Sequence, residues 1–251
     1  MNILITGANG YIGQRLIPVL LQEEHQLFCL VRNRNRFDEE HSSPLIVAIE
    51  GDFLKPDKLP APPEEIDVAY YLMHSMSGAA DFEDMEAETA KNFLTFIQKT
   101  KCRQIVFLTG IVNEQHLSRH LASRMKVEQI LSEGTVPLTA LRAGIIVGSG
   151  SASFEIIRDI VEKLPVMVAP KWLNTLCQPI AIRNVIQFLS SVALKEQCYN
   201  KNFDIGGPEV LSYKAMLQQF AKVRKLKRSI FIVPVMTPKL SSYWLYFITS
   251  T

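Results

Sequence analysis

A glycine-rich turn near the start of the chain limits the possible folds more than any other feature of the sequence. Gly7, Gly10 and Gly13 follow the apolar run Met1–Thr6 and open a segment of helical period, Tyr11–Gln22. In α/β proteins the first glycine allows a sharp turn, the second lets backbone N–H groups approach a pyrophosphate, and the third lets helix and strand pack closely. We therefore expect a dinucleotide at this turn. A tight turn without a ligand is the alternative.

The first half of the chain alternates between apolar runs of strand length and longer segments of helical period. Nearly continuous apolar runs are typical of strands that are covered on both faces. This alternation predicts an α/β fold, a doubly wound Rossmann-type parallel sheet with a small C-terminal lobe. The expected strands are Met1–Thr6, Gln26–Val31, Leu45–Ile49, Val68–Met73, Gln104–Leu108 and Leu138–Ile146, and the expected helices are Tyr11–Gln22, Asp81–Lys99 and Leu117–Ser132.

The pattern changes after about residue 145, where prolines become frequent and apolar runs become short. We predict an NAD(P)-binding Rossmann domain at 1–145 and a smaller substrate lobe at 146–235, interleaved with the edge of the sheet. Residues 236–251 would begin a C-terminal segment. The apolar stretch Leu240–Ile248 fits either a helix packed on the domain or the start of a region that the chain no longer contains, and we favour the second.

Composition excludes several classes of protein. A net charge of +2 is too small to indicate a nucleic-acid partner or an anionic membrane surface. No apolar run reaches the roughly 18 residues that a transmembrane helix needs, and no signal peptide is recognisable. The four cysteines lack the spacing of metal ligands, and we expect reduced thiols in a cytoplasmic protein. The expected partners are a dinucleotide cofactor and an unknown small molecule.

The end of the second expected strand indicates which dinucleotide is bound. NAD-binding sites place an acid there to accept from the ribose 2′-hydroxyl. This chain instead offers three arginines, Arg32, Arg34 and Arg36, of which Arg32 lies nearest the expected point. A guanidinium matches the oxygens of a 2′-phosphate, so the sequence favours NADP(H), with NAD(H) still possible. A solvated basic loop is the alternative.

A second candidate contact closes the third expected strand. The Asp52 carboxylate could accept from the adenine amino group, and the apolar ring of Phe53 could cover the adenine. An ordinary turn at the end of a strand explains the two residues equally well.

These motifs resemble those of the extended short-chain dehydrogenase/reductases, which include nucleotide-sugar epimerases. The resemblance covers about residues 1–235. It is carried by Thr6–Gly13, Gly51–Asp52, Leu108–Gly110, Arg142, Gly148, Gln178–Arg183 and Phe203–Pro208. A narrower resemblance, carried by Tyr70–Ser75, Gly148–Phe154 and Cys177–Ile180, is to an uncharacterised bacterial group of atypical members. Proteins of that group continue into a further C-terminal domain of unknown function.

The resemblance implies a catalytic motif that this chain alters. The superfamily places Tyr-x-x-Ser-Lys-x-x-x-Glu on the helix after the fifth strand, whereas this chain has His120, Ser123, Arg124 and Glu128 in that frame. Lys126 cannot replace the lysine, because it lies about 240° around the helix from His120. Arg124 could still bind ribose hydroxyls but cannot share a proton.

Two further positions join the candidate catalytic set. His120 can act as a general acid, although a hydrogen-bonded helix residue is the simpler interpretation. His74 ends the fourth expected strand and Thr109 the fifth, where the superfamily keeps a substrate-orienting Ser or Thr. No metal is expected from His74, His116 and His120, because acidic or cysteine partners are missing from the motif. The candidate catalytic residues are His120, Arg124, Thr109 and His74, and the candidate cofactor-binding residues are Gly7, Asn9, Gly10, Tyr11, Ile12, Gly13, Arg32, Asp52, Phe53, Leu72 and Arg124.

Three classes of function follow. The favoured one is an atypical NADP(H)-binding protein that lacks the Tyr-x-x-x-Lys pair and serves as a cofactor-binding or redox-sensing protein. The second is an NAD(P)-dependent oxidoreductase or epimerase that takes its proton from His120 or His74. The third is a scaffold with a vestigial nucleotide site. The fold alone does not separate them.

Overall fold

The computed structural model describes residues 1–40, 42–74, 82–112 and 119–233. The chain forms two compact units. The first contains residues 1–143 together with 183–205, and the second contains residues 144–182 together with the described residues from 206 onward. The expected boundary at 145 is close to the observed one, but residues 183–205 return to the first unit. The segment 236–251 lies outside the described residues.

The first unit is built on a seven-stranded sheet in which every neighbouring pair is parallel. Its strands are β1 (Asn2–Thr6), β2 (Gln26–Val31), β3 (Ile46–Glu50), β4 (Val68–Tyr71), β5 (Gln104–Gly110), β6 (Leu138–Ala143) and β11 (Lys201–Ile205). Their order is β11-β6-β5-β4-β1-β2-β3. The chain runs outward from β1 to β3 and then resumes on the other side of β1 at β4. Ligands of doubly wound sheets bind at the carboxyl ends of the strands at such a reversal.

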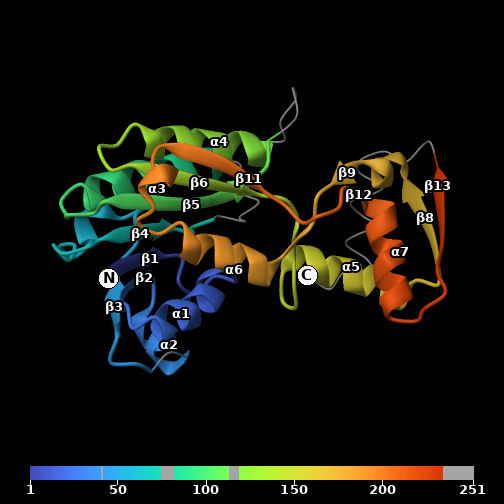
Figure 1. Ribbon diagram of the computed structural model, residues 1–251, viewed down its shortest axis with the longest axis horizontal. Coiled ribbons are helices and arrows are strands. Elements are labelled where there is room, and N and C mark those ends of the chain that lie inside the picture. Colours follow the sequence, from blue (N-terminus) through green and yellow to red (C-terminus); the bar gives the residue numbers. More distant parts are fainter. Residues whose placement is uncertain (41, 75–81, 113–118, 234–251) are drawn as a thin grey trace. The chain divides into compact units, whose positions relative to one another are not determined.

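Helices cover both faces of this sheet (Figure 1). They are α1 (Gly13–Gln22), α2 (Arg34–Glu40), α3 (Phe82–Ile97), α4 (Arg119–Ser132) and α6 (Ile182–Ser191), with short 3₁₀ turns at η1 (Pro56–Lys58) and η3 (Glu196–Cys198). Helices α3 and α4 lie on one face, and α1, α2 and α6 lie on the other. The α/β fold with a Rossmann-type parallel sheet, predicted from the sequence, is confirmed.

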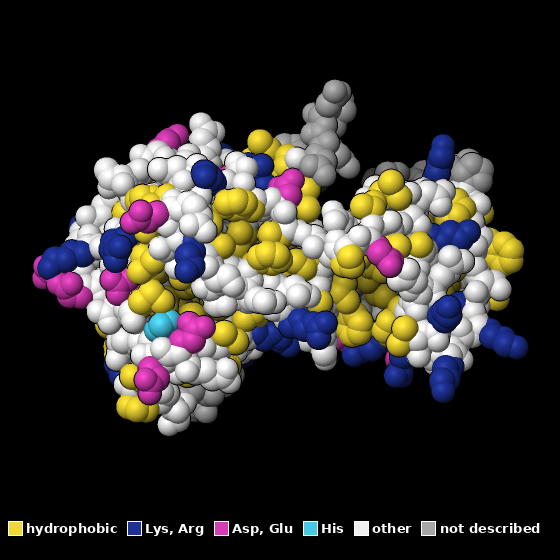
Figure 2. All heavy atoms as spheres, in the orientation of Figure 1, with side chains coloured by type: hydrophobic (Ala, Val, Ile, Leu, Met, Phe, Trp, Pro, Cys, Tyr) yellow, Lys and Arg dark blue, Asp and Glu magenta, His cyan; other side chains and the backbone are white. Residues whose placement is uncertain are grey.

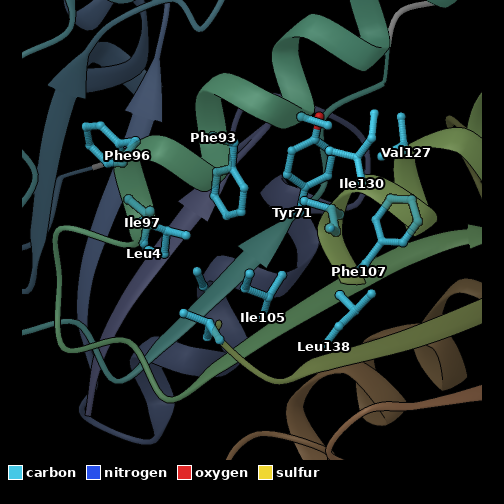
Figure 3. Packing of buried hydrophobic residues seen from close by; sticks show 14 of the residues in the cluster. Leu4, Tyr71, Phe93, Phe96, Ile97, Ile105, Phe107, Val127, Ile130 and Leu138 are labelled. Carbon is cyan, nitrogen blue, oxygen red and sulfur yellow. The ribbon is translucent and has the colours of Figure 1, made fainter. Parts of the chain in front are cut away.

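Neighbouring strand residues show why the strands are apolar on both faces. Tyr71 on β4 faces α3 and packs edge-on against Phe93, with ring centroids 4.9 Å apart (Figure 3). Tyr70, the preceding residue, points to the opposite face, where its hydroxyl donates to the Leu189 carbonyl of α6 at 2.9 Å. Alternation along a strand requires such opposite directions.

A buried glutamine ties the segment after α6 to the sheet. Gln104 Nε2 donates to Thr139 Oγ1 at 2.8 Å and to the Val192 carbonyl at 3.0 Å. Its Oε1 accepts from the Leu194 N–H at 2.5 Å. Gln104 is fully buried, so these bonds satisfy a side chain that would otherwise be costly to bury. They help to explain why residues 183–205 belong to the first unit.

The second unit consists of two helices and three small two-stranded sheets. The helices are α5 (Ala152–Lys163) and α7 (Tyr213–Val223), and a 3₁₀ turn, η2, covers Lys171–Asn174. The strand pairs are β7 (Ile146–Val147) with β10 (Ile180–Ala181), β9 (Leu176–Cys177) with β12 (Leu211–Ser212), and β8 (Val166–Pro170) with β13 (Ser229–Val233). Both helices start at a serine, Ser151 or Ser212, whose side chain accepts from a backbone N–H of the first turn. Apolar and basic side chains lie next to one another on the visible surface of this unit (Figure 2).

One expected strand differs from the structure. The run Leu138–Ile146 is divided, because β6 ends at Ala143 and Ile146 begins β7, which pairs in the second unit. Because the apolar run is continuous, the sequence does not show where the chain stops pairing in one sheet and begins to pair in another. Within the described ranges, no helix is long and apolar enough to cross a membrane, and all four cysteines are free.

Candidate dinucleotide-binding site

The glycine turn is closed tightly at two of its three glycines. Gly7 has φ +71°, and a Cβ atom there would lie 2.7 Å from the Leu72 carbonyl oxygen. A Cβ atom at Gly13 would lie 2.5 Å from the Gly7 oxygen and 2.8 Å from Ala8 Cα. Only glycine fits either position. Leu72, a predicted cofactor residue, thus lies directly against the turn.

The middle glycine has more room. The Gly10 N–H donates to the Gly7 carbonyl at 2.9 Å and closes the turn. A Cβ atom on Gly10 would meet only the Gly7 oxygen, at 3.1 Å, and both Asn9 and Gly10 are exposed. The space over Gly10 is therefore accessible, as a phosphate-binding position must be.

Helix α1 starts at this turn without a cap. Ile12 precedes the helix, no side chain caps its first N–H groups, and no acid occupies its first turn. The N–H groups of Gln14 and Arg15 donate to the Gly10 and Ile12 carbonyls, and the aligned peptide dipoles leave partial positive charge at this end of the helix. Such an end suits an anion, and the residues present fit the diphosphate of a dinucleotide.

Arg15 adds a positive charge that the sequence analysis did not single out. Its Nη1 donates to the Tyr11 carbonyl at 3.0 Å, and its guanidinium lies 3.8 Å from the centroid of the Tyr11 ring. The Tyr11 hydroxyl is buried and has no hydrogen-bond partner among the described residues. In the sequence, the four-residue spacing of Tyr11 and Arg15 was the signal that could have indicated this contact.

The three arginines after β2 differ in their surroundings. Arg32 follows Val31 directly and is exposed, whereas Arg34 and Arg36 belong to α2. The Arg34 N–H donates to Glu50 Oε2 at 2.9 Å, and the Arg36 N–H donates to Asn33 Oδ1 at 3.0 Å. Arg32 is thus the arginine at the carboxyl end of β2, as expected.

The adenine contact expected from Phe53 needs correction. Its side chain is 1% exposed and packs between Phe93 and Phe96, with centroids 5.7 and 5.5 Å away. A ring enclosed in the core cannot cover a ligand. The neighbouring Asp52 uses Oδ1 to accept from the Leu54 N–H at 3.0 Å, which stabilises the turn after β3.

A buried carboxylate, Glu86 on α3, contacts side chains from α4 and from the loop after β4. Its Oε1 lies 3.1 Å from Nδ1 of His74, and its Oε2 accepts from the Ser123 hydroxyl at 2.5 Å. The Glu86 side chain is only 5% exposed. Arg124 Nη1 lies 3.8 Å from the same Oε1, so one carboxylate joins α3, α4 and the loop after β4.

Arg124, which the sequence analysis expected at the cofactor ribose, belongs to the same cluster. Its guanidinium is buried, and it donates to the Met73 carbonyl at 3.0 Å and to the Leu108 carbonyl at 2.7 Å. It also lies 4.7 Å from the centroid of the Phe107 ring. Burial lowers the pKa of Arg124, and the nearby Glu86 opposes that change. Arg124 holds the ends of β4 and β5 together, and its hydrogen-bonding capacity is directed at the backbone.

The two candidate histidines lie together. The ring centroids of His74 and His120 are 4.7 Å apart, with an interplanar angle of 60°. Burial lowers the pKa of His120, the positive charges of His74 and Arg124 lower it further, and Glu86 opposes them. His120 is exposed and lies near the start of α4.

The remaining motif residues have separate places. Glu128 pairs with Arg142 of β6 through contacts of 2.7 and 3.1 Å. Lys126 contacts the exposed Asp84 at 3.6 Å, away from the histidines as its helical position requires. Thr109 is 9% exposed, and its hydroxyl has no partner among the described residues.

No metal site is apparent in the part of the chain that the structure describes. A search of these residues finds no cluster of three or more His, Cys, Asp or Glu side chains that could hold an ion. His116, one of the three histidines considered from the sequence, lies outside the described residues.

Comparison with known proteins identifies the family. A family model described as NAD(P)H-binding matches residues 7–157, which is more than half of the chain. The chain belongs to this NAD(P)H-binding family. The matched range begins at Gly7 and therefore includes the whole glycine turn.

Of two curated relatives of this NAD(P)H-binding chain, one is named as an assembly factor and the other as a reductase. Photosystem II assembly factor Ycf39 of Trieres chinensis is 25% identical over 240 residues, covering 90% of this chain and 72% of the relative. Divinyl chlorophyllide a 8-vinyl-reductase of Cucumis sativus is 23% identical over 223 residues, covering 82% of this chain. The alignment spans 53% of that second relative, about half its length.

Solved structures resemble the NAD(P)H-binding chain in fold. UDP-glucuronic acid 4-epimerase from Bacillus cereus, in complex with NAD, has a TM-score of 0.74 at 17% identity, covering 96% of this chain and 92% of that one. UDP-glucose 4-epimerase from Thermotoga maritima has a TM-score of 0.72 at 13% identity, covering 96% and 88%. The chain thus has a Rossmann fold of the short-chain dehydrogenase and epimerase type.

Proposed function

We propose that this chain binds NADP(H) in its first unit and serves as a cofactor-binding or redox-sensing protein. The observation that carries the proposal is the shape of the glycine turn. Gly7 and Gly13 leave no room for a side chain, whereas Gly10 is open over the uncapped start of α1. Exposed Arg32 at the end of β2 supports the choice of NADP(H), because a guanidinium can pair with a 2′-phosphate.

The altered motif on α4 supports binding over ordinary turnover. Tyrosine is replaced by His120, and the Arg124 side chain that replaces lysine donates to two backbone carbonyls. NADPH, when bound, supplies a hydride. The residues of this chain would hold its diphosphate at 7–13 and its 2′-phosphate at Arg32, but the usual proton-donating pair is missing.

A second candidate function is that of an NAD(P)-dependent oxidoreductase or epimerase with a histidine as proton donor. The contact between His74 and His120 at the carboxyl edge of the sheet favours it. The two curated relatives, an assembly factor and a reductase by name, are consistent with either class. A scaffold with a vestigial site, the third class, would bind neither coenzyme. We also propose a cytoplasmic location, which the four free cysteines support.

The variant Arg32→Ala tests the proposed cofactor. We expect NADPH affinity to fall by about 1–3 kcal/mol, roughly 5- to 150-fold, because a charge-assisted contact with the 2′-phosphate is lost. NADH affinity should stay unchanged, since NADH lacks that phosphate. Arg36→Ala removes the same charge from exposed α2 and is the matched control. Calorimetric titration of the native protein and the two variants with each coenzyme measures all six affinities. Tighter binding of NADH than of NADPH by the native protein would refute the assignment.

A further inference from the structure

The Glu86 cluster gives the second candidate function a specific proton donor, and the inference rests on the proposed cofactor site. His74 lies three residues beyond the end of β4. The backbone between them contacts the glycine turn at Leu72 and the Arg124 guanidinium at Met73. The histidine pair is therefore held at the same sheet edge as the turn, by neighbouring segments of one unit.

Glu86 fixes which ring nitrogen of His74 can exchange a proton. Its carboxylate cannot donate a hydrogen bond, so the contact of 3.1 Å requires the proton to be on Nδ1. Nε2, the other ring nitrogen, takes no part in this contact, and the His74 side chain is 32% exposed. A carboxylate that holds one nitrogen of a catalytic imidazole in this way sets its tautomer and stabilises its charged form.

Two charged side chains and a second imidazole ring lie next to His74. Glu86 carries the negative charge of the cluster, Arg124 carries a positive charge 3.8 Å away, and the His120 ring is in edge contact with His74. Burial and the neighbouring positive charges lower the pKa of His120, and Glu86 opposes them. Burial also raises the pKa of Tyr71, the other titratable group near Glu86 and Arg124.

A hydroxyl with no hydrogen-bond partner among the described residues lies on the same face of the sheet. Thr109 is two residues after Phe107 on β5, so both side chains point to one face. Phe107 lies under the Arg124 guanidinium, which places the Thr109 hydroxyl on the α4 side. A buried hydroxyl without an acceptor is destabilising, and an oxygen of a ligand could supply that acceptor.

We propose that His74, positioned by Glu86, gives the proton to the oxygen of a carbonyl substrate at this site. NADPH, when bound, would supply the hydride for the carbonyl carbon and would leave as NADP⁺. The carbonyl π bond breaks, the Nε2–H proton of the His74 imidazolium forms the new hydroxyl, and neutral His74 regains a proton from water. Glu86 is a positioning residue, since it acts through His74.

The tautomer of His74 tests the arrangement without any cofactor. In protein labelled with ¹⁵N at histidine, long-range ¹H–¹⁵N correlation spectra should show neutral His74 protonated at Nδ1. Glu86→Asp keeps the charge near Arg124 but withdraws the oxygens by one methylene, and we expect it to abolish this preference. Glu83→Asp on the same helix, which pairs with Arg119, is the matched control. Protonation at Nε2 in the native protein, or no effect of Glu86→Asp, overturns the inference.

Turnover tests the catalytic part with 9,10-phenanthrenequinone as the carbonyl probe and NADPH consumption as the readout. His74→Gln should lower kcat at least about tenfold, a modest share of a general acid's effect, with NADPH affinity unchanged. His25→Gln is the control, because His25 also pairs with a glutamate, Glu23, at 3.0 Å. If NADPH binds but is not consumed, or if His74→Gln is fully active, the inference is wrong while the binding function stands. If NADPH does not bind, the proposed function itself fails. The NMR measurement of the His74 tautomer then still tests the contact between His74 and Glu86.

Discussion

A methyl group added at Gly13 gives a sharp test of the glycine turn. In Gly13→Ala the new Cβ would lie 2.5 Å from the Gly7 oxygen, 2.7 Å from the Ala8 oxygen and 2.8 Å from Ala8 Cα. All three are backbone atoms, so no side-chain rotation relieves the contacts. Overpacking of this kind costs about 1–3 kcal/mol, whereas alanine in place of glycine gains at most about 1 kcal/mol in a helix. We expect a net loss of about 1–2 kcal/mol.

Thermal unfolding followed by circular dichroism measures this loss. For a chain of this size, 1 kcal/mol corresponds to about 2–4 °C, so the midpoint should fall by about 2–8 °C. Gly10→Ala is the matched comparison, because its Cβ would meet only the Gly7 oxygen, at 3.1 Å. It should unfold like the native protein yet bind NADPH at least about tenfold more weakly, a loss of about 1.4 kcal/mol. A Gly13→Ala protein as stable as the native one would refute the packing argument.

Two further substitutions and one labelling reaction test other parts of the structure. Gln104→Leu should destabilise the protein by about 2–4 kcal/mol, because the N–H of Leu194 and two acceptors lose their partner. Denaturant unfolding measures this loss, and unchanged stability would contradict the role of Gln104 in holding the segment after α6. Arg124→Lys should cost about 1–3 kcal/mol, since an ammonium cannot span the two carbonyls that the guanidinium binds, and unchanged stability would argue against this role. Burial raises the pKa of the Cys29 thiol to about 12, so thiol reagents should modify Cys29 only after unfolding, as peptide mass spectrometry would show; rapid labelling of the native protein would contradict its burial.

The sheet was predictable from sequence because its signals are local. Strand β2 has the expected bounds, Gln26–Val31, since an apolar run between turn residues is enough to define a buried strand. The division of Leu138–Ile146 was not predictable, because only tertiary pairing separates β6 from β7. The return of residues 183–205 to the sheet rests on long-range contacts, among them the pairing of β11 with β6 and the bonds of Gln104 to partners 35 to 90 positions away.

The site was predictable where backbone geometry defines it and not where side chains meet across elements. Gly7 and Gly13 have the steric roles that their spacing indicates. The role expected for Phe53 differs from the structure, because position in a motif does not reveal burial. Glu86 was missed since, within its helix, it is one of several acids, and only contact with His74 distinguishes it.

The most direct test of the account is calorimetric titration of the folded native protein with NADPH and NADH. We predict saturable binding at one site, tighter for NADPH, and binding of NADPH at least about tenfold weaker in Gly10→Ala. Failure of the folded protein to bind either coenzyme, oxidised or reduced, would contradict the claim that the turn between β1 and α1 holds a dinucleotide.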